Sequence, residues 1–122
     1  MNRPVLFQNF PEKIICPVNR FSDLLETEAG KNVSVSFMND QDLQGTITSV
    51  VSKYDNRLQS VVIKLTNFPG ATLTFSRIIN EHGIYSYAGR ILSFQHGDAY
   101  EITLENGQYY FIKKGFYDLV NE

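Results

Sequence analysis

The sequence predicts an all-β domain in which antiparallel strands meander and bend into a closed or half-closed barrel. Two observations carry this prediction. Between residues 32 and 114, apolar and polar residues alternate with a period of two, as in strands that bury one face. Short clusters rich in Gly, Asn, Asp and Pro separate these segments, and such short connections join antiparallel neighbours. We expect one domain over residues 1–122 with seven strands and one short N-terminal helix; a β-sandwich is the alternative.

The turn at Asn106-Gly107 sets the register of the C-terminal strands. This dipeptide favours a two-residue type I′ hairpin, in which both residues take positive φ. Residues that pair across such a hairpin share a face of the sheet. The face predicted to be buried consists of Tyr100, Ile102, Leu104, Tyr109 and Phe111.

The preceding turn, around residues 95–98, leaves two registers open. A loop of odd length places Leu92 and Phe94 beside Tyr100, whereas a loop of even length places Ile91 there. The odd register buries more apolar surface on that face. Gly97 also suits the left-handed position of a three-residue loop, so we expect a three-residue loop.

The other strands follow from the same alternation. They are expected from residue 32 and over residues 43–53, 60–67, 71–79 and 84–94, and the last two strands flank Asn106-Gly107. Phe68-Pro69-Gly70 fits a type II turn. Gly45 and Gly89 lie inside strand patterns and are the expected bending points of the barrel.

The ends of the chain are expected to pack against this sheet. Residues 1–20 hold three of the four prolines and read as an extended arm that lies over the sheet or pairs at its edge. Residues 21–29 are the helix, capped by Ser22 or Asp23 and ended by Gly30. Residues 115–122 form an apolar tail that packs back onto the barrel.

Composition narrows the possible functions. The net charge of −2 gives no overall field that attracts nucleic acid or anionic membranes, so both are disfavoured as partners. Cys16 stands alone, which rules out an internal disulfide, and it is expected to be a buried thiol. The chain has no signal-peptide pattern and no apolar run long enough to span a membrane, so we expect a cytoplasmic protein.

No motif in the sequence predicts catalysis. His96 lies in a turn with no second ligand at a metal-binding spacing, and neither a metal nor a cofactor is expected. Glu101 and Glu105 share the outer face of one strand, where solvated carboxylates are the ordinary case. Nucleophile elbows and phosphate-binding loops are absent from the sequence. The prediction is therefore a non-enzymatic protein.

Residues 24–58 resemble the first half of an Sm-like domain. The residues that match this family's pattern of helix, glycine, alternating strand and bent second strand are Gly30, Val33, Val35, Phe37, Asn39, Gly45 and Ile47. The resemblance implies a small β-barrel. The family's RNA pocket uses an Asp four residues before an Asn, and this chain has Ser52 in that place before Asn56. The pocket also uses a later Arg-Gly, whereas the order here is Gly89-Arg90. The resemblance therefore gives little support to RNA binding.

The most suggestive surface combines aromatic and basic residues. Tyr85, Tyr87 and Tyr110 are expected on the outer face with Arg90 nearby. Tyrosine is common at protein interfaces, so we expect a binding module whose partner is another protein or a second copy of the chain. The same aromatic face suits single-stranded nucleic acid or a glycan as an alternative.

A small-ligand carrier with its site in the barrel mouth is the first alternative to the binding module. It requires Phe94, Tyr100, Tyr109 and Phe111 to converge on one face at the mouth of the barrel. Such a carrier needs a cavity of roughly 300 Å³ or more.

Overall fold

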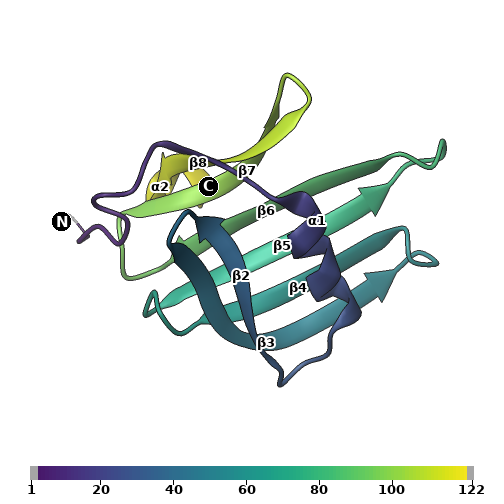
Figure 1. Cartoon of the computed structure of the whole chain (residues 1–122), viewed down its shortest axis with the longest axis horizontal. Helices are drawn as coiled ribbons and strands as arrows, with labels where there is room; N and C mark the ends of the chain where they lie inside the picture. Colours follow the sequence, from purple (N-terminus) through teal and green to yellow (C-terminus); the bar gives the residue numbers. More distant parts are fainter. Residues whose placement is uncertain (1–2, 121–122) are drawn as a thin grey trace.

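The computed structural model describes residues 3–120, which form one antiparallel sheet and three short helical segments (Figure 1). The strand order is β1-β8-β7-β6-β5-β4-β3-β2. The strands are β1 (Lys13–Ile15), β2 (Asn32–Met38), β3 (Gln41–Lys53), β4 (Leu58–Leu65), β5 (Ala71–Ile79), β6 (Tyr85–Ser93), β7 (Asp98–Glu105) and β8 (Gln108–Gly115). The helical segments are α1 (Val18–Asp23), the 3₁₀ turn η1 (Leu24–Glu26) and α2 (Phe116–Leu119).

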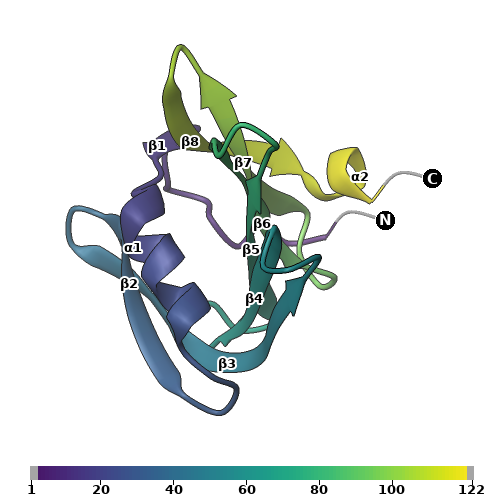
Figure 2. The same ribbon diagram turned by 90° about the vertical axis from the view of Figure 1, so that its right-hand side faces the viewer.

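The sheet curls into a half-closed barrel. Its two edges, β1 and β2, face the same opening but are not paired with one another (Figure 2). The predicted antiparallel meander is confirmed, and the β-sandwich is excluded because all eight strands belong to one sheet. The eighth strand is β1, a part of the N-terminal arm that pairs with β8 at the edge.

Close contact between backbones explains the two glycines inside strands. A Cβ atom at Gly45 would collide with the carbonyl oxygen of Lys64 on β4. A Cβ atom at Gly89 would collide in the same way with the carbonyl oxygen of Thr74 on β5. Neither position has room for a side chain where the sheet curves. The register shift in β3 lies after Gly45, between Ile47 and Ser49.

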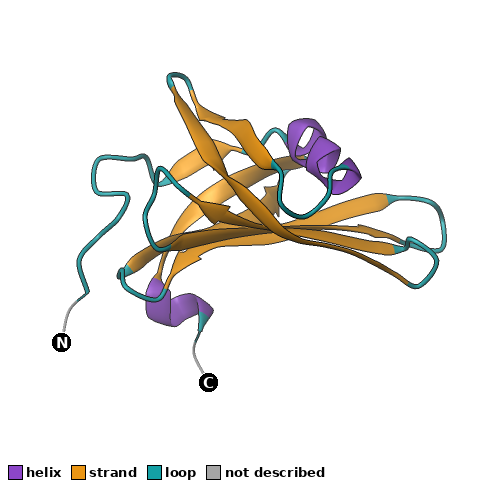
Figure 3. Cartoon of the chain, turned by 90° about the horizontal axis from the view of Figure 1, so that it is seen from below, coloured by secondary structure: helices purple, strands orange, loops and turns teal. Residues whose placement is uncertain are grey.

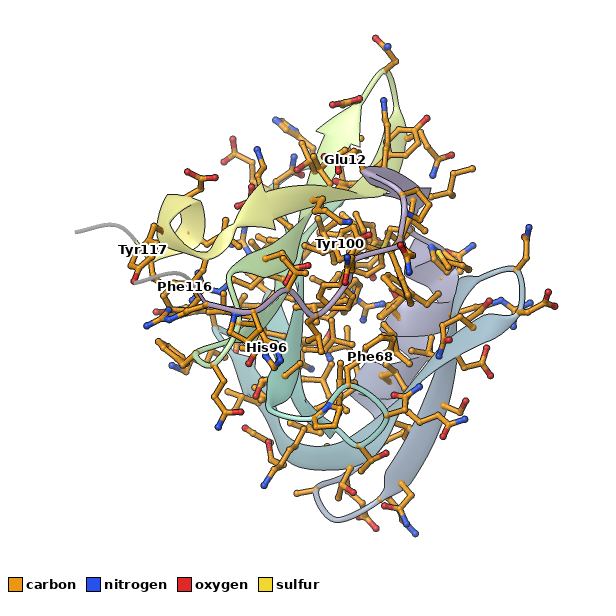
Figure 4. All side chains as sticks on the ribbon, turned by 90° about the vertical axis from the view of Figure 1, so that its left-hand side faces the viewer. Glu12, Phe68, His96, Tyr100, Phe116 and Tyr117 are labelled. Carbon is orange, nitrogen blue, oxygen red and sulfur yellow. The ribbon has the colours of Figure 1, made fainter. Side chains whose placement is uncertain are left out.

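The N-terminal arm closes one end of the half-barrel (Figure 4). The side chain of Phe7 is fully buried, and its ring centroid lies 4.9 Å from that of Tyr100. The hydroxyl of Tyr100 donates a hydrogen bond to the carbonyl of Pro11 at 2.6 Å. The Nζ of Lys113 donates to the carbonyls of Phe7 and Phe10, each at 2.7 Å. The arm is therefore held by side chains of β7 and β8.

The segment α1 with η1 covers the middle of the concave face. The ring of Phe21 lies 5.5 Å from both Phe75 and Phe111, measured between centroids. The helical segment begins at Val18 and ends at Glu26, earlier at both ends than predicted. The helix starts directly after Pro17, the N-cap residue, whose carbonyl accepts the N–H of Arg20 and Phe21.

The capping prediction for this helix is wrong. Ser22 and Asp23 lie inside the helical segment, and neither α1 nor η1 has a side-chain cap. The sequence predicts the cap at Ser22 or Asp23, whereas the chain already turns into the helix at Pro17.

The turn prediction at Asn106-Gly107 is confirmed. Both residues have positive φ, 50° and 80°, and Leu104 pairs with Tyr109 as expected. The predicted type II turn at Phe68-Pro69-Gly70 is also confirmed, since Gly70 has φ 86° and the N–H of Ala71 donates to the carbonyl of Phe68. Within the predicted buried face of the hairpin, Leu104 is an exception and is exposed.

The expectation of a three-residue loop before β7 is wrong. Ile91 pairs with Tyr100, and the connection spans residues 94–97, an even number. Leu92 and Phe94 therefore face the convex side. The physical reason is α2, which packs on that side and buries Leu92 and Ala99 beneath Phe116. The prediction counted the apolar side chains buried on the concave face and left out those buried on the convex face.

The two helices α1 and α2 lie on opposite sides of the sheet (Figure 3). The tail thus packs on the convex side and does not fill an end of the barrel. Within residues 3–120, no helix has the length and apolar character needed to cross a membrane.

Candidate functional site

The concave face continues beyond α1 at the ends of β4, β5 and β6 (Figure 1). The side chains of Tyr85 and Tyr87 lie there, because residues at odd positions of β6 share the face of buried Ile91. Both tyrosines had been expected on the outer face, and the even loop length reverses that assignment. We call the surface they form with Gln59, Arg77 and Tyr109 the tyrosine shelf.

Arg77 is the charged centre of the tyrosine shelf. Its Nη2 donates a hydrogen bond to Oε1 of Gln59 at 2.6 Å. Its guanidinium carbon lies 4.6 Å from the ring centroid of Tyr85, in a cation–π contact. Its Nε is buried and has no hydrogen-bond partner within residues 3–120. The guanidinium of Arg77 is thus oriented by two neighbours, while Nε and the terminal N–H groups not used on Gln59 donate to no atom within residues 3–120.

The other tyrosines join the shelf to the core. The ring of Tyr87 stacks on Phe75 at 5.7 Å and meets the edge of Tyr109 at 5.2 Å, measured between centroids. The hydroxyl of Tyr109 accepts the backbone N–H of Tyr87 at 3.2 Å. These contacts fix the floor of the shelf, whereas Tyr85 remains 48% exposed.

The sheet separates beside the shelf. The only register pairs between β6 and β7 within the described chain are Arg90 with Glu101 and Ile91 with Tyr100. Residues 85–89 of β6 therefore have a strand neighbour on the β5 side and none on the β7 side. Apart from the N–H of Tyr87, which donates to the hydroxyl of Tyr109, a strand edge of this kind exposes backbone donors and acceptors that can pair with another extended chain.

An open hollow of about 690 Å³ lies at this end of the sheet. Arg57 and Arg77 both line it, together with Tyr85. Two carboxylates, Asp55 and Glu81, lie in the same lining. Among the described residues, the ion pairs join Lys13 with Glu105 and His82 with Glu81, so neither arginine is paired with a carboxylate.

Two of the predicted surface residues lie elsewhere. Arg90 is on the convex face, where its Nη1 donates to the carbonyl of Leu119 at 3.2 Å. Tyr110 is also convex, and the Nζ of Lys13 lies 4.4 Å from its ring centroid. The predicted set of four therefore divides into the shelf pair, Tyr85 and Tyr87, and two separate contacts.

The residues expected to line a carrier cavity do not converge. Tyr100 and Phe111 are fully buried in the aromatic core. Phe94 is 67% exposed on the convex side, with its ring 5.3 Å from that of Phe116. Tyr109 belongs to the shelf.

The side chains that were candidates for catalysis or metal binding make contacts of a structural kind. His96 shares a hydrogen bond of 2.7 Å between its Nδ1 and the Oγ of Ser93, inside the loop before β7. Burial raises the pKa of the Cys16 thiol to about 12, which leaves it protonated and a poor nucleophile at neutral pH. No cluster of three His, Cys, Asp or Glu side chains that suits a metal occurs within residues 3–120.

Sequence reasoning missed the role of Gln59 and the position of Arg77. Arg77 stands at an odd position of β5, in phase with buried Leu73 and Phe75, and that phase was the available signal. Gln59 has the same phase on β4 relative to Val61, but a lone glutamine carries no signal of its own.

Comparisons with family models, with curated proteins and with solved structures found no match to this chain.

Proposed function

We propose that this protein is a non-enzymatic interaction module that binds an extended segment of a protein partner on the tyrosine shelf. The observation that carries the proposal is the guanidinium of Arg77, which Gln59 holds beside the exposed ring of Tyr85 and which has no carboxylate partner within residues 3–120. Tyrosine and arginine are the residue types that dominate binding energy at protein interfaces.

The strand edge beside the shelf supports a polypeptide as the ligand. Residues 85–89 of β6 lack a strand neighbour on the β7 side; the hydroxyl of Tyr109 takes the N–H of Tyr87, and an extended peptide can pair with the rest of this edge by main-chain hydrogen bonds. The aromatic rings next to the edge then contact alternate side chains of the added segment.

Charge supports a protein segment over nucleic acid as the ligand. Asp55 and Glu81 line the hollow next to the two arginines, so a continuous phosphate backbone would meet repulsion there. A protein segment carries its charges singly and can place them beside Arg57 or Arg77.

The proposal is tested by site-specific photo-cross-linking in cells that express the protein. A photoreactive phenylalanine at position 85 is expected to cross-link one defined protein, and the matched probe at exposed Tyr117 on α2 is not. Tyr85→Ser should lower recovery of that protein on an affinity resin by about tenfold, as for a hot-spot residue. Equal recovery with wild type and Tyr85→Ser, or cross-linking from position 117 alone, contradicts the proposal.

A further inference from the structure

We infer that the guanidinium of Arg77 is the recognition point for a carboxylate of the bound partner; this rests on the proposed function of the tyrosine shelf. Arg77 uses Nη2 on Gln59, while its buried Nε has no partner in the described chain. Nε is covered by protein atoms, so a ligand oxygen that enters the hollow would accept from the terminal N–H groups of the guanidinium, which Gln59 uses only in part.

The surroundings of Arg77 hold its fork ready. Gln59 fixes one terminal nitrogen at 2.6 Å, and the ring of Tyr85 lies 4.6 Å from the guanidinium carbon. A carboxylate commonly accepts two parallel hydrogen bonds from one guanidinium fork. Since the fork is already oriented, binding loses less side-chain entropy than it would with a free arginine.

Within the described residues, no carboxylate forms an ion pair with Arg77. The ion pairs of residues 3–120 leave it out, although Asp55 and Glu81 line the same hollow. Asp55 and Glu81 also limit how much negative charge a ligand can carry in this hollow. They repel a doubly charged phosphate more strongly than a singly charged carboxylate, so an acidic side chain or the C-terminal carboxylate of the partner fits best.

The first experiment measures the Nε–Hε resonance of Arg77 by NMR, assigned by its loss in Arg77→Lys. The probes are acetyl-Ala-Glu-Ala-amide, its Gln analogue, acetyl-Ala-Ala-Ala with a free C-terminus, and inorganic phosphate. A saturable shift with the Glu peptide or the free-acid peptide, and none with the Gln peptide, is expected. These two carboxylate peptides distinguish the side-chain source from the C-terminal source. No shift with either carboxylate, a shift of equal size with the Gln peptide, or a shift with phosphate alone overturns the inference.

The second experiment provides the carboxylate from within the chain. Gln59→Glu places an acid where Arg77 already donates, so it should raise the melting temperature and weaken binding of the carboxylate peptide by at least about tenfold. Gln44→Glu, an exposed position on β3, is the matched control and should bind as wild type. Peptide binding by Gln59→Glu at wild-type strength overturns the inference.

The two proposals fail separately. If Tyr85→Ser abolishes capture of the cross-linked protein but Gln59→Glu does not change it, the shelf is the binding surface and the carboxylate assignment is wrong. If neither variant changes capture while the Arg77 resonance still responds to carboxylates, the anion site exists and the proposed interaction function is wrong.

Discussion

The carboxylate of Asp98 accepts the backbone N–H of Phe7 at 2.8 Å, across 91 positions of the chain. Its other oxygen accepts the N–H of Leu6 at 2.6 Å. Asp98 is 8% exposed, so two charge-assisted hydrogen bonds form where water competes little. This one side chain ties the N-terminal arm to the start of β7 and brings Phe7 to its place in the aromatic core.

Replacing Asp98 by Asn should release the arm. The amide has one acceptor oxygen, and its NH₂ group would face one of the two N–H donors, so we expect a loss of about 2–3 kcal/mol in the free energy of unfolding. Urea denaturation measures this loss, and hydrogen exchange at Leu6 and Phe7 should accelerate with it. Asp40→Asn, at an exposed turn, should stay within about 0.5 kcal/mol of wild type. Equal stability of the two variants would show that the arm is held by other contacts.

The even loop before β7 separates two phenylalanines that sequence reasoning had grouped together. Phe111→Ala should cost about 3–5 kcal/mol, because it empties a site where the ring contacts Phe21, Phe37 and Tyr100. Phe94→Ala should cost about 1 kcal/mol or less, since its ring is largely exposed and its aromatic contact is with Phe116. Thermal denaturation of the two variants checks the difference. Similar losses would favour the three-residue loop, in which both rings face the core.

Gly89 should not tolerate a side chain. An added Cβ meets the carbonyl oxygen of Thr74 and the Cδ1 of Ile102, so the neighbouring strand must move. We expect Gly89→Ala to lower the free energy of unfolding by about 1–3 kcal/mol, the usual cost of overpacking. Ser86→Ala, on the exposed part of the same strand, is the control and should be close to neutral. A neutral Gly89→Ala would mean that β5 and β6 separate easily at this point.

Local patterns were sufficient to predict most of the sheet. The period of two marks β2 to β8, and β5 has the predicted bounds because Pro69-Gly70 before it and residues 80–83 after it are clear turn signals. Asn106-Gly107 fixed the pairing of β7 with β8 without any distant information.

The errors arise where two distant segments meet. The loop before β7 depends on whether Leu92 is covered on the convex side, and α2 provides that cover from the far end of the chain. The same error moved Tyr85 and Tyr87 from the outer face to the concave face. For the candidate site, the sequence predicted that Tyr85 and Tyr87 form part of a binding surface. It did not predict that they lie on the same face of the sheet as Arg77. Pairing of the N-terminal arm at the sheet edge was one of the two predicted alternatives, but the bounds of β1 were not predicted because three residues give no measurable period.

Stability should fall at alkaline pH because two buried groups resist deprotonation. Burial raises the pKa of Cys16 from about 9.0 to about 12, and burial followed by the charges of Glu12 and Asp98 raises the pKa of Tyr100 above its ordinary value of 10.0. The unfolded chain loses these protons first, so unfolding releases protons above pH 9 for Cys16 and above pH 10 for Tyr100. Each group contributes its full stabilisation below those values and loses it as the pH rises.

Urea denaturation across the alkaline range separates the two contributions. Each group should add a slope of up to about 1.4 kcal/mol per pH unit to the decrease in the free energy of unfolding. Cys16→Ala should remove the slope that begins near pH 9.0, and Tyr100→Phe the part that begins near pH 10.0. Ser86→Ala, which removes no titrating group, should leave the profile unchanged. Profiles of Cys16→Ala and wild type that run parallel above pH 9.0 would show that the thiol deprotonates as readily in the folded chain as in the unfolded one.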